Sequence, residues 1–322
     1  MVSAQGLSPT ASAAARTVIL TGPTASGKSG WALALAQRHR DVEIINADSL
    51  LVYRGLDIGT AKPTAEELAA VPHHLIDIRD PDQPYTAGDF VREVETALSL
   101  IHQRGRRALI VGGTAFYLRA LLFGLWDSPP SDPTVRTALE ALTNPELYAR
   151  LESQDAAAAR RIGINDRYRM LRFLEIIQLT GNLPSDLRAA ETREADPRFE
   201  LVVIDRQDEA LSARIAQRTA QMLAAGLLNE AQSLRSRWPR ARALQSVGYK
   251  QSVDYLDGIK PAGRKIPEGL AGLAQEITLA TRQLVKRQRT FFNGESLRAV
   301  SRKFTLEADS HGLQAFLEEF YS

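Results

Sequence analysis

Residues 22–29 read GPTASGKS, and the spacing of their two glycines, lysine and serine fits binding of a phosphate group. The glycines let backbone N–H groups turn inward around an anion, and a helix that starts here directs its positive end to the same point. Lys28 supplies a point charge, and the hydroxyl of Ser29 can ligate Mg²⁺. The predicted phosphate-binding residues are Gly22, Pro23, Thr24, Ala25, Ser26, Gly27, Lys28 and Ser29.

A phosphate loop does not by itself identify the ligand. A triphosphatase or kinase would also need an acidic residue at the end of a second strand to hold Mg²⁺, and Asp48 in the segment VEIINADS is such a residue. Asp48 could hold a metal ion or cap a helix. It could also act as a general base, because a carboxylate at the C-terminal end of a strand lies where open α/β sheets bind ligands.

Short β-branched segments alternate with segments of helical period, which predicts a parallel sheet with helices on both faces. The predicted strands are 17–21, 42–47, 108–112 and 201–205, and the predicted helices among them are 29–40 and 86–104. After the breaker DSPPSDP the sequence is mostly helical and charged, and after Asp205 it is helical almost to the end. We predict an α/β catalytic core of 17–125 and 199–322, a helical insertion domain of 126–198, and a disordered tail of 1–16.

The composition narrows the function classes. The absence of cysteine excludes disulfides, thiolate zinc sites and cysteine nucleophiles, and no apolar stretch is long enough to span a bilayer. We therefore expect a cytoplasmic protein without a membrane partner. The net charge is only +2, but basic residues gather at 235–250 and 282–303. These clusters favour a polyanionic partner, although solvated helix faces explain each cluster equally well.

Further segments resemble bacterial tRNA dimethylallyltransferases, the IPP transferase family, in one continuous order from about Val18 to Gly294. These segments are NADSLLVYRGLDIGTAKP, PHHLIDI, YTAGDF, VGGTAFYLRAL, NDRYRMLRFLE, RIAQRTAQML, LQSVGYKQ and ATRQLVKRQRTFF. The resemblance implies a P-loop NTPase-like fold, Mg²⁺, and an insertion domain that contacts the tRNA anticodon stem-loop. It implies transfer of a dimethylallyl group from dimethylallyl diphosphate to N6 of the adenosine 3′-adjacent to the anticodon, in tRNAs reading codons that start with U. We also expect a monomer.

The resemblance assigns roles to individual residues. Asp48 corresponds to the carboxylate that accepts the N6 proton, and Thr114 to a threonine near the target base. Arg218 corresponds to an arginine that approaches the diphosphate, and Arg214 precedes it by one helical turn, so an anion between the two would offset their repulsion. The implied tRNA-binding residues are Asp48, Ser49, Leu50, Leu51, Thr114, Arg136, Arg169, Arg172, Gln245, Gly248, Tyr249 and Lys250.

Within the tRNA-binding set, Gly248 provides a turn and Tyr249 a ring that could stack on a base. Arg282, Lys286 and Arg289 share one face of the last basic helix. This face could contact phosphate groups or could simply be a solvated basic surface. His73 and His74 lack metal-like spacing partners, and we interpret them as structural.

The sequence departs from the family pattern at two single residues and two pairs of residues. Leu51 stands where many relatives carry glutamine, Gln251 where glutamate is common, and the pairs 115–116 and 167–168 also differ. These differences bear on tRNA contacts and leave the phosphate loop intact. Two other functions remain open at this point: a P-loop kinase or ATPase acting on a small metabolite, which would turn over ATP, and an RNA-binding protein without activity.

Overall fold

The computed structural model describes residues 16–125, 129–189, 194–259 and 267–322. Its chain divides into two compact units, Met1–Leu122 with Asp196–Ser322, and Phe123–Ala195. The insertion domain was predicted at 126–198, so each bound of the observed unit lies slightly earlier. Most of the predicted tail of 1–16, and most of the loop that links Gly258 to Gly269, lie outside the described residues.

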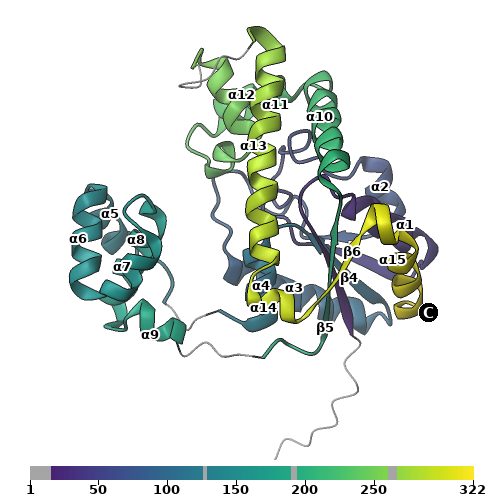
Figure 1. Cartoon of the computed structure of the whole chain (residues 1–322), viewed down its shortest axis with the longest axis horizontal. Helices are drawn as coiled ribbons and strands as arrows, with labels where there is room; N and C mark the ends of the chain where they lie inside the picture. The colour runs from purple at the N-terminus through teal and green to yellow at the C-terminus, as the bar shows by residue number, and fades with distance from the viewer. Residues whose placement is uncertain (1–15, 126–128, 190–193, 260–266) are drawn as a thin grey trace, which may run out of the picture. The chain divides into compact units, whose positions relative to one another are not determined.

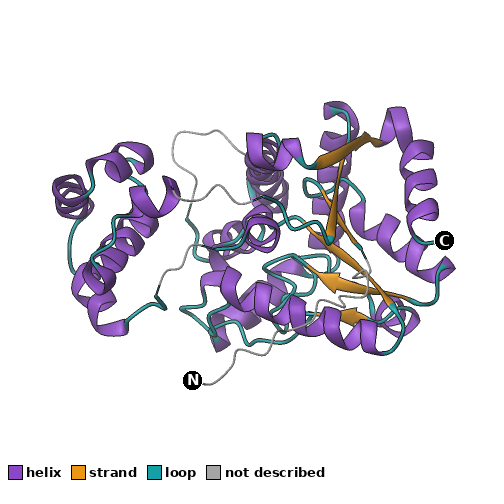
Figure 2. Ribbon diagram, turned by 90° about the horizontal axis from the view of Figure 1, so that it is seen from below, coloured by secondary structure: helices purple, strands orange, loops and turns teal. Residues whose placement is uncertain are grey.

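Within the described residues, the first unit is built on a six-stranded sheet with the order β3-β2-β4-β1-β5-β6, and all its pairings are parallel. Figure 2 shows helices on both sides of these strands, which confirms the predicted fold class. The strands are β1 (Thr17–Thr21), β2 (Val42–Asn46), β3 (His73–His74), β4 (Arg107–Gly112), β5 (Phe199–Asp205) and β6 (Ser301–Thr305).

The central strands are buried on both faces, which is why they read as continuous apolar, β-branched runs. Val18 and Leu20 of β1 belong to one core cluster with side chains of helix α1 (Lys28–Arg38) and helix α15 (Leu306–Phe320). Helix α3 (Ala87–Gln103) contacts β2 and β4 and begins at Thr86, whose side chain forms a capping box with Asp89.

The second half of the first unit follows Asp205. Besides α15, its helices are α10 (Asp208–Ala224), α11 (Leu227–Arg237), α12 (Tyr249–Leu256), α13 (Gly269–Phe292) and α14 (Glu295–Ala299), with a 3₁₀ turn at Arg242–Gln245 (Figure 1). The prediction of helix almost to the end is wrong at 301–305, because these residues form β6 and extend the sheet beside β5. The remaining short helices are α2 (Ala65–Ala70) and α4 (Ala115–Phe123).

A buried carboxylate ties β2 to its neighbours. Glu43 is 3% exposed, and its Oε2 lies 2.6 Å from Nε2 of His74 and 2.8 Å from the guanidinium of Arg104. Burial alone would raise the pKa of Glu43, but these two partners hold it below its usual range. His74 therefore has the structural role that the sequence suggested.

The described part of the second unit is entirely helical, with α5 (Pro133–Glu140), α6 (Asn144–Gln154), α7 (Ala156–Ile162), α8 (Arg167–Thr180) and α9 (Pro184–Ala189). These helices enclose their own core, which includes Leu139, Leu151, Met170 and Leu174. Asp132 caps α5 through hydrogen bonds to two backbone N–H groups. Across the ranges that the structure describes, no helix is both long and apolar enough to cross a membrane.

Candidate active site

The phosphate loop joins β1 to α1 at the C-terminal edge of the sheet. Gly22 has φ +150°, and a Cβ atom there would lie 2.0 Å from the carbonyl oxygen of Ile204. Gly27 is the N-cap of α1, with φ +100°. Both positions therefore require glycine, because a side chain would be strained at either one and would also collide with β5 at Gly22.

Arginines hold the loop from outside through its carbonyl groups. Nε of Arg214 donates to the carbonyl of Ala25 at 2.9 Å, and Nε of Arg206 donates to the carbonyl of Ser26 at 2.8 Å. The side-chain oxygen of Ser26 is buried without a hydrogen-bond partner among the described residues. An unpaired hydroxyl of this kind is costly unless a ligand satisfies it, so the loop is suited to receive a polar group.

Gln288 of α13 was missed by the sequence analysis. Its Oε1 accepts a hydrogen bond from the backbone N–H of Thr24 at 2.9 Å, and its Nε2 donates to the carbonyl of Gly113 at 3.0 Å. One amide therefore ties the phosphate loop to the segment that follows β4. A glutamine within a basic helix has no spacing signal that could have revealed this contact.

Lys28 stands at the first position of α1, and its Nζ lies 3.4 Å from the carbonyl oxygen of Pro23. Burial lowers the pKa of Lys28 to about 8; the charge of Asp48 opposes this effect, and that of Arg218 adds to it. The hydroxyl-bearing Ser29 next to it is exposed. The loop therefore presents a cation whose charge is only weakly balanced, which favours an anionic ligand.

The segments that carry Asp48 and Thr114 lie side by side where β2 and β4 end. The backbone N–H of Ser49 donates to Oγ1 of Thr114 at 2.9 Å, and the N–H of Thr114 donates to the carbonyl of Ala47 at 3.2 Å. A Cβ atom at Gly112 would lie 2.1 Å from the carbonyl carbon of Ala47, so glycine permits this close approach.

The carboxylate of Asp48 is half-buried. Its Oδ1 accepts a hydrogen bond from the N–H of Leu50 at 3.0 Å, whereas Oδ2 has no donor among the described residues. A turn follows Asp48, so the helix-cap alternative is wrong. The free oxygen and the position at the strand end suit a proton acceptor.

Arg218 lies one turn after Arg214 on α10 and is partly buried. Its guanidinium donates to the carbonyl oxygen of Thr60 at 3.0 Å, and this is its only hydrogen bond to a described residue. Burial lowers the pKa of Arg218, while Asp48 raises it and Arg214 lowers it further. Because guanidinium carries five N–H donors, most of them remain for a ligand.

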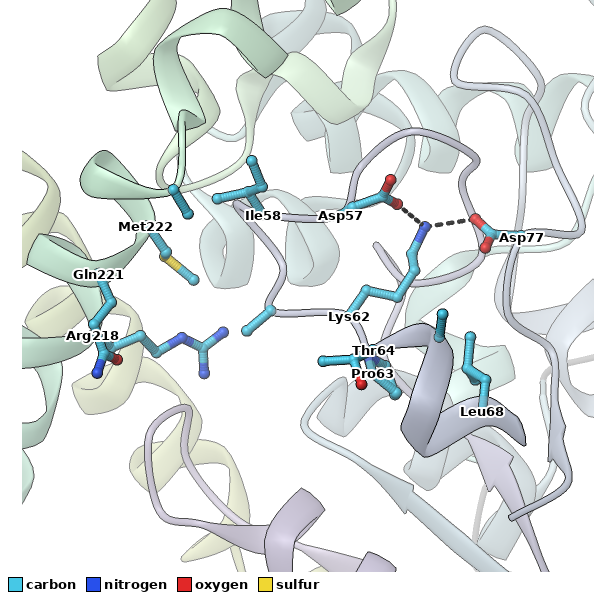
Figure 3. A pocket seen from close by; sticks show the side chains of 13 residues that line it. Asp57, Ile58, Lys62, Pro63, Thr64, Leu68, Asp77, Arg218, Gln221 and Met222 are labelled. Atoms are coloured by element: carbon cyan, nitrogen blue, oxygen red, sulfur yellow. Dashed lines mark hydrogen bonds and ion pairs between the residues drawn. The ribbon is translucent and has the colours of Figure 1, made fainter. Parts of the chain in front are cut away.

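The same arginine lines a cavity of about 520 Å³ between α10 and the segment 57–77. Figure 3 shows Arg218, Gln221 and Met222 on one side and Lys62 on the other, with the Lys62 amine between the carboxylates of Asp57 and Asp77. The cavity therefore joins the predicted diphosphate-binding arginine to a mixed polar and apolar space.

The residues predicted for tRNA contact fall into two groups. In the first unit, Gln245 and Lys250 are exposed, and Lys250 pairs with Asp254 at 2.7 Å. Gly248 has φ +96° and precedes α12, so its turn role is confirmed. Tyr249 is 0% exposed, which rules out the expected stacking of its ring on a base in this structure.

In the second unit, the three predicted arginines all pair with carboxylates of the same unit. Arg169 pairs with Asp166 at 2.8 Å, and Arg172 pairs at 2.9 Å with the fully buried carboxylate of Glu175. Arg136 pairs with Glu140 at 3.0 Å and also lies 3.9 Å from Glu175. A phosphate group that binds these arginines would have to compete with the carboxylates. The competition is weakest at Arg169, which is exposed.

The basic face of α13 is divided. Arg282 and Lys286 are exposed, but Arg289 forms a two-point ion pair with Asp205 at 2.9 Å and a further ion pair with Asp208. Arg289 therefore fixes α13 to the end of β5, and the expectation that it contacts phosphate is not met in this structure.

A model of the IPP transferase family matches residues 51–295. The chain belongs to this family. It is 44% identical to a tRNA dimethylallyltransferase of a Polaromonas species, over 90% of this chain and 91% of that one. It is 46% identical to a tRNA dimethylallyltransferase of Burkholderia thailandensis, over 91% and 92%.

Solved structures agree with this membership. The tRNA isopentenylpyrophosphate transferase of Bacillus halodurans is 32% identical, with a TM-score of 0.65, over 95% of this chain and 97% of that one. A eukaryotic dimethylallyltransferase, described as acting on tRNA, is 25% identical, with a TM-score of 0.78, over 94% and 78%. Leu51, one of the departures from the IPP transferase pattern, is only partly exposed, as are its neighbours Ser49 and Leu50.

The described side chains suit Mg²⁺ only as an ion that is held mainly by the substrate. Among the described residues, no group of three or more histidine or carboxylate side chains could form a cation site. The exposed hydroxyl of Ser29 would be one protein ligand of Mg²⁺, because Mg²⁺ often takes few protein ligands and is held largely by substrate phosphates and water.

Proposed function

We propose that this protein transfers a dimethylallyl group from dimethylallyl diphosphate to tRNA, at N6 of the adenosine 3′-adjacent to the anticodon. The observation that carries the proposal is a phosphate loop with cationic side chains beside a carboxylate, Asp48, whose Oδ2 has no donor among the described residues. Lys28 lies in the phosphate loop, Arg214 donates to the carbonyl of Ala25 in that loop, and Arg218 lies one turn after Arg214. Asp48 acts electrostatically on Lys28 and Arg218. A small-metabolite kinase or ATPase is not favoured.

The residues divide the reaction between leaving group and nucleophile. The allylic C–O bond breaks while the diphosphate gains negative charge, which Lys28 and Arg218 stabilise. The N6 nitrogen forms the new C–N bond, and its proton passes to the free oxygen of Asp48. Thr114 holds the backbone beside Asp48 through the N–H of Ser49, so the acceptor stays in place.

Mg²⁺ would be held by Ser29 and the diphosphate oxygens, where it supplies further neutralisation of the leaving group. The anticodon stem-loop would contact Arg136, Arg169 and Arg172 of the second unit together with Gln245 and Lys250 of the first. We further propose that the tRNAs are those reading codons that start with U, and that the protein acts as a cytoplasmic monomer.

The test is a transfer assay with labelled dimethylallyl diphosphate, unmodified tRNA and Mg²⁺, followed by digestion and detection of N6-prenylated adenosine. Asp48→Asn is expected to lower the single-turnover rate by about 10²-fold or more, with tRNA affinity within a few-fold of wild type. Asp82→Asn is the matched control, because Asp82 is exposed.

Two results would contradict the proposal. If label never reaches RNA while labelled ATP is turned over, the kinase reading replaces it. If label reaches RNA but Asp48→Asn keeps the wild-type rate, another group accepts the proton.

A further inference from the structure

A single carboxylate collects an unusual set of donors outside the active site. Oε2 of Glu230, on α11, accepts hydrogen bonds from the backbone N–H groups of Asp57 and Ile58 at 3.1 and 2.8 Å. Oε1 accepts from the N–H of Gly59 at 3.0 Å and from the hydroxyl of Tyr249 at 2.6 Å. Three successive backbone N–H groups around one anion form a concave anion-binding arrangement.

The segment 57–60 that Glu230 holds leads directly to the active site. Its last carbonyl, that of Thr60, is the acceptor for the guanidinium of Arg218 at 3.0 Å. Since Arg218 makes no other hydrogen bond to the described residues, the direction of this carbonyl sets the direction of the guanidinium.

The ring of Tyr249 packs against the same segment, 57–60. A Cβ atom at Gly59 would lie 2.5 Å from the Tyr249 ring, so backbone and ring are in direct contact. Tyr249 therefore supports the segment by packing and also holds Glu230 through its hydroxyl. This contact explains why a tyrosine follows Gly248 although its ring is closed to bases.

The far end of the segment has its own anchor. The Lys62 side chain is 5% exposed and donates to the carbonyl of Tyr53 at 2.9 Å and to Asp57 at 2.6 Å. The hydroxyl of Thr60 donates to the carbonyl of Leu56 at 2.6 Å. The segment is thus fixed on both sides of the Thr60 carbonyl.

We infer that Glu230, supported by Tyr249, is a positioning residue that holds the Arg218 guanidinium in place for the diphosphate through the backbone of 57–60. The expected effect of Glu230 on the transfer rate rests on the proposed function. The expected effect on diphosphate binding does not, because Arg218 would contact any diphosphate. Loss of the Glu230 charge weakens or removes its hydrogen bonds to three N–H groups, and the Thr60 carbonyl is then held less firmly against Arg218.

The experiment is a double-mutant cycle that joins Glu230→Gln to Arg218→Ala. Glu230→Gln keeps the side-chain shape but replaces one acceptor oxygen by a donor NH₂ group facing backbone N–H groups. It is expected to lower the single-turnover transfer rate about tenfold with unchanged tRNA affinity, and to lower it less than about twofold when Arg218 is already alanine. Glu209→Gln, on the exposed start of α10, is the matched control.

A purely structural role would give a different pattern. The inference is overturned if Glu230→Gln has the wild-type rate, or if its full effect persists in the Arg218→Ala background. Tyr249→Phe keeps the ring and removes only the hydroxyl, so it serves if Glu230→Gln fails to fold. Its smaller loss, about threefold, must also disappear in the Arg218→Ala background.

Binding of inorganic diphosphate, measured by calorimetry, separates this inference from the proposed function. If wild-type protein does not prenylate tRNA, the proposed function fails. Glu230→Gln is still expected to weaken diphosphate binding about tenfold, with this effect lost in Arg218→Ala. If diphosphate binding is the same in wild type and Glu230→Gln, the inference fails whatever the transfer assay shows.

Discussion

The lowered pKa of Lys28 predicts that affinity for the prenyl donor depends on pH in a range where an ordinary lysine would show no change. Burial lowers this pKa from 10.5 to about 8, a difference that corresponds to roughly 3 kcal/mol between the two protonation states. The charged form is the one that binds diphosphate. Affinity is therefore full below the pKa and is lost as the pH rises through it.

The size of the effect follows from the fraction of charged Lys28. At about pH 7 roughly nine tenths of the free protein carries the cation, and at about pH 9 roughly one tenth does. The apparent Kd for the donor should therefore rise about tenfold over this range. The measurement is calorimetric titration with a non-reactive thio analogue of dimethylallyl diphosphate at constant free Mg²⁺.

Two variants distinguish titration of Lys28 from titration of the ligand or of other groups on the protein. Lys28→Arg keeps a charge throughout the range and should show a flat profile, because guanidinium does not titrate there. Lys28→Ala should bind about 10–100-fold more weakly than wild type near pH 7, as expected for a lost charge-assisted hydrogen bond, and this gap should narrow as the pH rises above 8. A flat wild-type profile, or the same decline in Lys28→Arg, would refute the reasoning.

Three further predictions concern other parts of the molecule. Gln288→Leu removes the hydrogen bonds that join Gln288 to Thr24 of the phosphate loop and to Gly113, so binding of the donor should weaken by roughly 1–2 kcal/mol in the same titration. Gln283→Leu, on the exposed face of α13, should leave donor binding unchanged. Glu43→Gln should lower the free energy of unfolding by about 1–3 kcal/mol near neutral pH. The pKa of Glu43 is lowered in the folded state, so the contribution of its charge to stability is full above the ordinary pKa of 4.5 and is lost as the pH falls through the folded-state pKa. In urea unfolding, the difference in stability between wild type and Glu43→Gln should therefore shrink in acid. A difference that stays constant with pH would contradict this prediction. Arg169→Gln with Lys250→Gln should make the salt dependence of tRNA binding shallower by about 1.4 in log Kd against log salt, and an unchanged slope would remove both from the interface.

The strands that could be predicted are those buried on both faces. β1, β2, β4 and β5 are central, so burial on both sides selects the uninterrupted apolar runs that the sequence shows. β3 and β6 are the edges of the described sheet. β3 has only His73 and His74, which is too short for any pattern, and β6 carries Arg302 and Lys303, which led to its assignment to a basic cluster.

The phosphate loop, Asp48 and Thr114 could be predicted because parallel strands bring their C-terminal ends to one edge. Gln288 and Glu230 could not, since each acts through contacts set by helix packing. The basic clusters were also only partly informative. Arg289 and Arg302 are balanced by Asp205 and Glu200, which lie far away in the sequence.

The position of β1 has a consequence for synthesis of the chain. β1 is paired on both sides in the finished sheet, but its partner for Thr17 begins at Phe199. At ordinary rates of about 5–20 residues per second, β1 waits roughly 10–40 s for β5 to be made. During that time one edge of TVILT, an uncharged β-branched run, is open to pairing with other nascent chains. The yield of folded protein should therefore depend on what covers this edge on the ribosome.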